Sequence, residues 1–257
     1  MACTLAVLTL TVGAGDACLS RRAAEVEANS SSPAKSTAAA TPSPALEPSP
    51  APIAWADIAR SYERVSDYVC RYEKEERTVS NGELQTIRLS FRKPFDVRME
   101  WLDDKDTVDQ TAVYRQGAND GKVLARQKGL VGSLMGTMRL DPNDSLALED
   151  SRHPVTEVGL GKIIERAQAA ATNPLVTSRF DGEETLDNHP AYRFEFTSGS
   201  AAVMGLNGAR KALVWVDRDL KLPVKLELYD ASQTLLERHR FKDVRVNTKL
   251  SDKTFTL

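Results

Sequence analysis

The chain is poor in cysteine, with three in 257 residues. Cys3, Cys18 and Cys70 are too few for a disulfide framework, and no two of them have zinc-ligand spacing. The chain also lacks an excess of one charge, because 34 basic residues face 36 acidic ones. Nucleic acid is therefore not an expected partner. No apolar run approaches the roughly 18 residues that a membrane-spanning helix needs.

Catalytic and metal-binding motifs are lacking as well. The histidines His153, His189 and His239 are far apart in the sequence and form no two-histidine metal motif. Ser133 has no Gly-x-Ser-x-Gly pattern around it, and Cys70 lies on an alternating segment that suits a buried structural thiol. We therefore expect a protein that is not an enzyme and that uses no metal or cofactor.

The N-terminus resembles an export signal. Thr4 to Ala14 is apolar or small and has the length of a signal-peptide core. Small residues on both sides of Asp16 precede Cys18, as at a bacterial lipoprotein cleavage site where the cysteine is lipidated. We predict a signal peptide over 1–17, export to the periplasm or outer membrane, and a membrane anchor on Cys18. The alternative is that Cys18 is an ordinary leader residue, since Asp16 is unusual in such a motif.

A linker follows over 18–52. Its later part is rich in Ala, Ser, Thr and Pro and cannot bury enough apolar surface to offset its ordering entropy. Tethers of this composition hold a domain away from a membrane surface. We expect the folded domain over 53–257, as one unit, with a division near Asn173 as the alternative.

Helical and strand patterns occupy this domain. Apolar residues at helical spacing predict helices over Trp55–Val65 and Val155–Ala171. Asn81-Gly82 predicts a hairpin turn, because both residues tolerate positive φ. Strands are predicted over Tyr68–Arg77, Leu84–Phe91, Asp96–Leu102, Thr111–Arg115, Lys122–Gln127, Leu175–Phe180, Glu184–Leu186, Ala191–Phe196, Lys211–Val216, Leu222–Tyr229 and Leu235–Phe241, followed by a polar exit over Lys242–Asn247.

Alternation within the strands predicts how they assemble. Near the C-terminus, Val224, Leu226 and Leu228 alternate with Lys225 and Glu227. This pattern is typical of an antiparallel sheet with one covered face and one wet face. We predict an α+β fold in which a single curved antiparallel sheet of at least seven strands carries the two helices on its concave face.

Several motifs resemble known families. In Ser90–Trp101 a strand ends in a basic residue and proline and the next strand carries an aromatic residue, which resembles the periplasmic lipoprotein carriers of the LolA type. Phe91–Pro94, His153–Gly161 and Leu222–Val224 resemble the DUF1571 family of uncharacterised bacterial envelope proteins. The resemblance covers roughly Trp55–Leu257.

The resemblance implies an open half-barrel with helices across its concave side. In the carriers the apolar space under the helices takes acyl chains, so a lipid or acyl group is the implied ligand. The basic residue before the proline gates that space, and Lys93 holds this position; an exposed strand end is the other interpretation. A carrier that shuttles between membranes must be soluble, whereas this chain has a linker and a predicted membrane anchor. These two features favour a fixed envelope protein.

The candidate ligand contacts are Phe91, Lys93, Met99, Trp101, Phe194 and Trp215, and ordinary core packing is the alternative for each apolar one. Gly129–Met138, with three glycines among apolar residues, is expected to be a mobile loop or short helix that covers the ligand. The resulting hypothesis is a non-enzymatic envelope protein that binds an acyl group. The competing hypothesis is an interaction protein with a self-filled core whose edges bind a protein partner.

Overall fold

The computed structural model describes residues 51–77, 82–128 and 136–257, all within the unit Leu46–Leu257. The predicted signal peptide, Cys18 and most of the linker lie outside these residues. So do Asn81 of the predicted turn and residues 129–135 of the predicted cover. Every helix of the described part is too short or too polar to span a bilayer.

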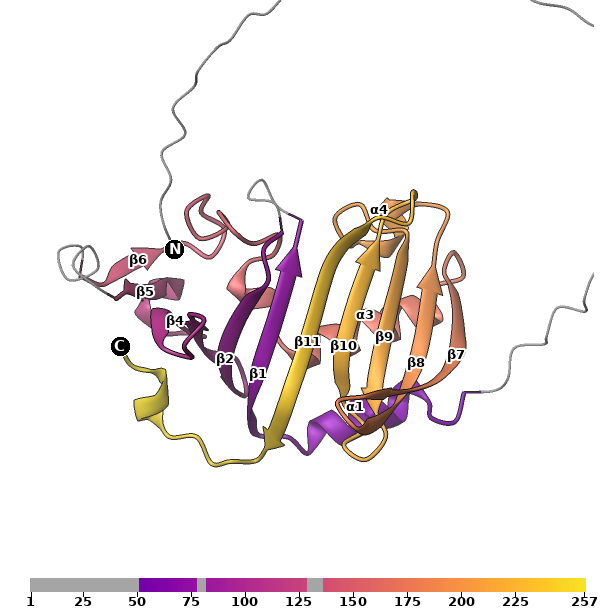
Figure 1. Ribbon diagram of the computed structural model, residues 1–257, viewed down its shortest axis with the longest axis horizontal. Coiled ribbons are helices and arrows are strands. Elements are labelled where there is room, and N and C mark those ends of the chain that lie inside the picture. Colours follow the sequence, from indigo (N-terminus) through magenta and orange to yellow (C-terminus); the bar gives the residue numbers. More distant parts are fainter. Residues whose placement is uncertain (1–50, 78–81, 129–135) are drawn as a thin grey trace, which may run out of the picture. The chain divides into compact units, whose positions relative to one another are not determined.

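One open antiparallel sheet dominates the structure, as predicted (Figure 1). Its eleven strands are ordered β6-β5-β4-β3-β2-β1-β11-β10-β9-β8-β7. The strands are β1 (Asp67–Glu76), β2 (Gln85–Arg92), β3 (Asp96–Leu102), β4 (Val108–Arg115), β5 (Val123–Gln127), β6 (Met138–Leu140), β7 (Thr177–Leu186), β8 (His189–Thr197), β9 (Lys211–Asp217), β10 (Pro223–Tyr229) and β11 (Leu235–Val246). The first and last strands are neighbours at the centre, where Tyr72 lies opposite Phe241.

Two helices cover one face of this sheet, which we call the inner face. They are α1 (Trp55–Glu63) and α3 (Leu160–Thr172), and they pack against each other. A Cβ on Gly161 would come within 2.7 Å of the Tyr62 ring, so this close approach requires a glycine. The short helices are η1 (Asn119–Gly121), η2 (Val155–Glu157), α4 (Ala201–Met204) and η3 (Asp252–Phe255).

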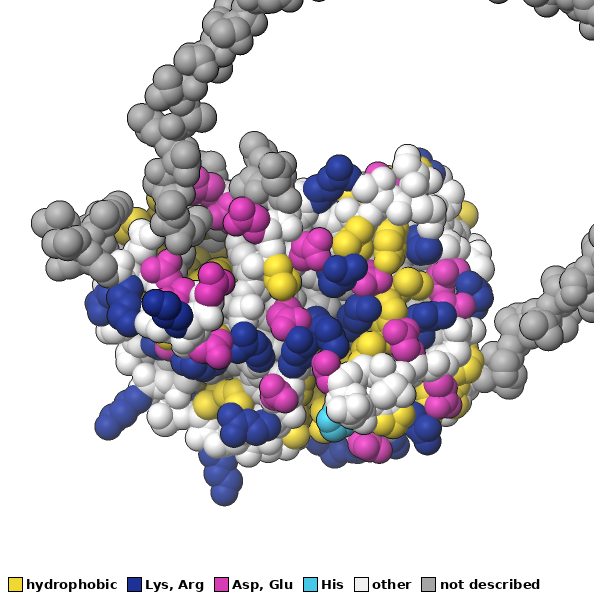
Figure 2. Space-filling view, viewed as in Figure 1, with side chains coloured by type: hydrophobic (Ala, Val, Ile, Leu, Met, Phe, Trp, Pro, Cys, Tyr) yellow, Lys and Arg dark blue, Asp and Glu magenta, His cyan; other side chains and the backbone are white. Residues whose placement is uncertain are grey.

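The two faces of the sheet differ as the alternation predicts. Inward residues such as Ile87 and Leu89 are fully buried in the core. The opposite, outer face carries acidic and basic side chains side by side (Figure 2). Several of them form cross-strand ion pairs, among them Glu73 with Lys242 at 2.5 Å. The α+β fold class with one curved, open sheet is thus confirmed.

Some boundaries differ from prediction. The expected polar exit after Phe241 is largely strand, because β11 stays paired with β1 through Val246 opposite Tyr68. The expected second helix begins only at Leu160, after η2 and a Gly159 whose φ is 107°. The runs on either side of Asp181 form one strand, β7, with a register shift beside Gly182. In each case, pairing across the sheet or backbone geometry overrides the local pattern.

Candidate ligand-binding surface and buried polar cluster

Three predicted ligand contacts lie in the core on the inner face. Phe91, Met99 and Phe194 are only 3%, 7% and 2% exposed. Phe91 stacks on Tyr68 with ring centroids 5.1 Å apart, and Phe194 lies 5.1 Å from the Trp55 ring of α1. The chain's own side chains therefore occupy the space between the helices and the sheet at these positions.

The two predicted tryptophans lie on opposite faces. Trp101 packs at the edge of the core, and its indole N–H donates to Gln85 Oε1 at 3.1 Å. Trp215 is buried on the outer face, where Lys225 Nζ lies 4.0 Å from its ring centroid. Its indole N–H donates to Glu184 Oε2 at 2.8 Å. Trp215 therefore does not share a surface with the other candidates.

Lys93 holds the end of α1. Its Nζ donates to the carbonyl oxygens of Tyr62 at 2.6 Å and Glu63 at 3.3 Å, and it lies 4.2 Å from the centroid of the Tyr62 ring. A cation at the last carbonyls of a helix satisfies acceptors that have no partner inside it. Burial lowers the pKa of Lys93, and the charge of Glu63 opposes that shift. Lys93 therefore ties the connection between β2 and β3 to the end of α1, and its role as a latch over a ligand stays a prediction.

The inner face continues beyond the helices onto β4–β6. Met99 lies opposite Ala112, Ala112 opposite Ala125, and Ala125 opposite Met138, so one apolar row crosses four strands. The residues of this row beyond Met99, together with their apolar inward neighbours, form what we call the apolar strip; the polar Gln110 and Gln127 lie beside it in the row of Trp101. The apolar strip consists of Trp101, Ala112, Tyr114, Val123, Ala125, Met138 and Leu140.

The apolar strip lies to one side of the helices. Helix α3 packs mainly against β10 and β7, on the other half of the sheet (Figure 1). Trp101, Tyr114, Met138 and Leu140 are accordingly only partly buried. An apolar surface of this kind, continuous with a core, is suited to an apolar ligand.

A buried polar cluster lies on the inner face, where β1 ends and β11 begins. Its members are Lys74, Glu76, Arg152, His153, Glu237 and His239. Glu237 is 1% exposed and accepts from Arg152 Nε at 2.6 Å and His153 Nε2 at 2.9 Å. His239 Nε2 lies 3.1 Å from Glu237 Oε2, and its Nδ1 lies 2.7 Å from the Tyr72 hydroxyl.

Glu76 and Lys74 complete the polar cluster. Glu76 Oε2 accepts from the backbone N–H of Arg152 at 2.6 Å, and Lys74 Nζ donates to the carbonyl oxygen of Asp150 at 3.1 Å. These contacts fix the segment around Arg152 to the two central strands. Burial alone would raise the pKa of Glu237, but hydrogen bonds from His153 and His239 lower it well below its usual range.

Charge balance decides what the polar cluster can do. Glu76, Glu237 and His239 offer donor atoms within 4.8 Å of one another, the arrangement nearest to a metal site among the described residues. Lys74 and Arg152 already pair with the two carboxylates at 3.5 Å and 2.6 Å, so a divalent cation would add uncompensated charge. The cluster is therefore suited to holding a segment in place.

Sequence patterns do not predict this cluster, because His153 comes from a loop and meets Glu237 only in the folded chain. A signal was nevertheless present. Lys74 and Glu76 continue the inward phase of Tyr72 along β1, and buried charges in that phase call for partners.

Comparison with known proteins gives one family match. The model of a family described as "Protein of unknown function (DUF1571)" matches residues 65–257. No curated protein matches the chain.

Several solved structures are similar. The MucA/MucB complex of Pseudomonas aeruginosa matches with 18% identity over 79% of this chain and 59% of that chain, at a TM-score of 0.48. The lipoprotein LppX of Mycobacterium tuberculosis matches with 12% identity over 77% and 96%, at 0.46. The LolA superfamily protein NE2245 of Nitrosomonas europaea matches with 12% identity over 80% and 98%, at 0.32. The chain spans about three-fifths of the length of MucB.

Proposed function

The chain belongs to the DUF1571 family, and we propose that it is a non-enzymatic protein of the bacterial envelope that binds an acyl chain on the apolar strip. The observation that carries the proposal is the position of that strip. It lies on the inner face and is continuous with the core through Met99. Its partly exposed members are Trp101, Tyr114, Met138 and Leu140.

Of the ligand contacts that the sequence suggests, the strip includes Trp101 and adjoins Met99. Phe91 and Phe194 pack against the chain's own rings, whereas the side chains of Trp101, Met138 and Leu140 are only partly buried and can contact an acyl chain. Each methylene that is fully buried against such a surface contributes about 0.8 kcal/mol. A chain of several methylenes can therefore offset the cost of its own ordering.

The envelope location rests on the N-terminal sequence. An apolar run and small residues precede Cys18, and a linker poor in apolar residues follows it. In this proposal residues 1–17 are removed, Cys18 carries the lipid, and 18–52 tethers the domain 53–257. A Cys18→Ser variant should move from the membrane to the soluble fraction. Unchanged membrane partition, with no acyl mass on the native protein, would contradict the anchor.

The acyl-binding site can be tested with a matched pair of leucines. Leu140 lies in the apolar strip, whereas Leu124 on the adjacent β5 points to the outer face, and both are partly buried. Leu140→Glu should weaken fatty-acid binding more than tenfold, because an unpaired charge in an apolar site costs several kcal/mol. Leu124→Glu should leave binding intact. Edge strand β6 is only three residues long, which limits damage to the fold.

The assay is displacement of a fluorescent fatty acid from the delipidated full-length chain, with thermal unfolding as the check on folding. Equal losses in both variants would exclude the strip as the site. Absence of binding by the folded wild type would favour the alternative, an interaction protein that binds a partner at its edge strands β6 and β7.

A further inference from the structure

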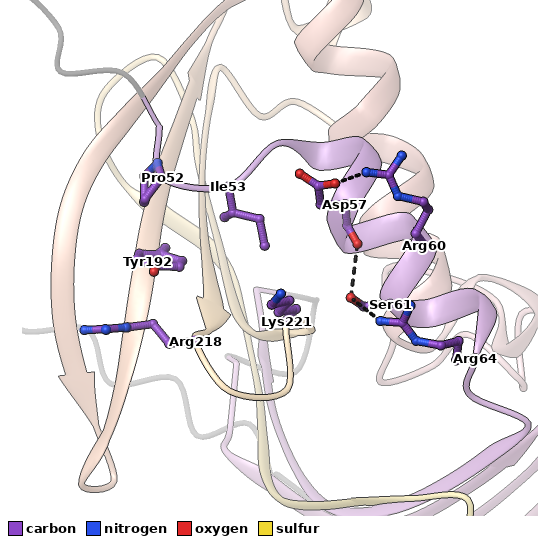
Figure 3. Close-up of a pocket in the computed structure, with 9 residues that line it drawn as sticks. All are labelled: Pro52, Ile53, Asp57, Arg60, Ser61, Arg64, Tyr192, Arg218 and Lys221. Carbon is purple, nitrogen blue, oxygen red and sulfur yellow. Dashed lines mark hydrogen bonds and ion pairs between the residues drawn. The ribbon is translucent and has the colours of Figure 1, made fainter.

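A basic cavity lies between α1 and the turn that joins β9 to β10, far along the sheet from the apolar strip. Its volume is about 360 Å³. Asp57, Arg60, Ser61 and Arg64 line one side, and Tyr192 and Arg218 line the other (Figure 3). Lys221 also lines it, so four cations and one carboxylate face the same space.

The single carboxylate is already engaged. Asp57 forms an ion pair with Arg60, its neighbour one turn along α1. Arg64 Nη2 donates to Ser61 Oγ at 3.3 Å, and Arg218 Nη1 pairs with Glu183 outside the cavity at 3.1 Å.

Two positive charges therefore remain uncompensated. Within the part of the chain that the structure describes, neither Arg64 nor Lys221 has a carboxylate partner. An anion that entered the cavity would meet both of them without displacing an existing ion pair.

Lys221 occupies its position at a conformational cost. Its φ is 53°, in the left-handed region where glycine or asparagine is less strained than lysine. The turn is held by its own bonds: Asp217 Oδ1 accepts from the backbone N–H groups of Asp219 at 2.9 Å and Leu220 at 2.8 Å. The lysine side chain makes none of these bonds, so its identity is not needed to form the turn.

From these observations we propose that the cavity binds a phosphate group, presented either as a free phosphate or as the headgroup of an anionic phospholipid. The guanidinium of Arg64 offers the donor geometry that phosphate oxygens accept, and Lys221 adds a point charge opposite it. The inference does not depend on the acyl chain, because the residues of the two sites do not overlap.

The test uses the full-length chain and a matched pair of lysines. Lys221→Gly removes the cation and relieves the left-handed strain. Lys249→Gly is the control, because Lys249 is exposed at a φ of 62° and only its backbone N–H makes a bond, to Asp67 Oδ2 at 3.1 Å. Both changes remove one charge from the same backbone conformation.

Binding is measured in two arms. Calorimetric titration with inorganic phosphate tests the free ion, and flotation with phosphatidylcholine vesicles, with and without phosphatidylglycerol, tests the headgroup. We expect saturable binding in at least one arm, weakened by added salt. Lys221→Gly should weaken it about fivefold or more, Lys249→Gly should leave it unchanged, and neither variant should lower the unfolding temperature.

Each result decides the proposal. Binding of phosphate alone identifies a free-phosphate site, and selective flotation with phosphatidylglycerol identifies a headgroup site. Vesicles that differ only in their headgroups cancel any contribution of an N-terminal acyl group. No binding in either arm would overturn the proposal. Equal weakening by both glycine variants would also overturn it, because net charge alone would then account for the affinity.

Discussion

Replacing Glu237 by glutamine should lower the free energy of unfolding by about 3–5 kcal/mol, because it breaks a buried ion pair. The carboxylate accepts hydrogen bonds from Arg152 and His153. Glutamine keeps the shape but loses the charge, and its NH₂ group would face one of these donors. Two charge-assisted hydrogen bonds, at about 1.5–3 kcal/mol each, give a loss of the same size. Such a loss is a large share of the roughly 5–15 kcal/mol by which domains are stable.

The assay is urea unfolding of the full-length chain at pH 6, with Glu75→Gln as the control. Glu75 Oε2 pairs with Arg238 Nη1 at 2.8 Å, but its side chain is 33% exposed on the outer face. Exposed pairs of this kind contribute about 0–1 kcal/mol. The two variants make the same chemical change and differ mainly in burial. If Glu237→Gln lost no more stability than Glu75→Gln, the argument that burial gives the polar cluster its strength would be wrong.

Three further experiments test other parts of the structure. Burial lowers the pKa of His153, but the hydrogen bond and the charge of Glu237 outweigh burial and raise the pKa above the ordinary 6.5. The stabilisation that protonated His153 gives the folded state is therefore complete below pH 6.5 and is lost as the pH rises through the folded-state pKa. Urea unfolding should therefore show a larger loss from His153→Gln at pH 5.5 than at pH 9, and a loss independent of pH would contradict the assignment. Burial raises the pKa of the Cys70 thiol, so in a Cys3→Ser, Cys18→Ser background Ellman's reagent should label it only in denaturant; rapid labelling of that native variant would show that the site opens. Gly161→Ala should cost about 1–3 kcal/mol in thermal unfolding, because its Cβ would meet the Tyr62 ring, and a Tyr62→Ala background should remove most of that cost.

The sequence predicts the sheet well where one face is apolar and the other polar. The alternation of Leu226 and Leu228 with Glu227 assigns the faces of β10 correctly. It fails where both faces are apolar. The run around Trp215 in β9 shows no alternation, so the sequence cannot place this tryptophan on the outer face, where Lys225 covers it. Which face of the sheet a residue of β9 occupies depends on how β9 pairs with its neighbouring strand, and the local sequence pattern does not include that strand.

The candidate sites were predictable only in part. Met99 and Trp101 follow from the phase of β3, but the apolar row from Met99 to Met138 requires the strand order. The polar cluster depends on contacts between residues more than 70 positions apart, such as Arg152 with Glu76. The basic cavity is lined by residues from α1 and from the turn that contains Lys221. Such contacts are products of the fold, and single-sequence patterns do not contain them.

The pairing of β1 with β11 has a consequence for how the chain folds. Tyr72 and His239 are 167 residues apart, yet their side chains meet in the middle of the sheet. The strands β1–β6 and β7–β11 can each form from local hairpins, whereas the seam between them closes only when the last strand is present. Joining such distant segments slows folding, and until the seam closes both halves expose unpaired strand edges. A chain that crosses a membrane N-terminus first would therefore complete its central seam only after almost all of it had been translocated.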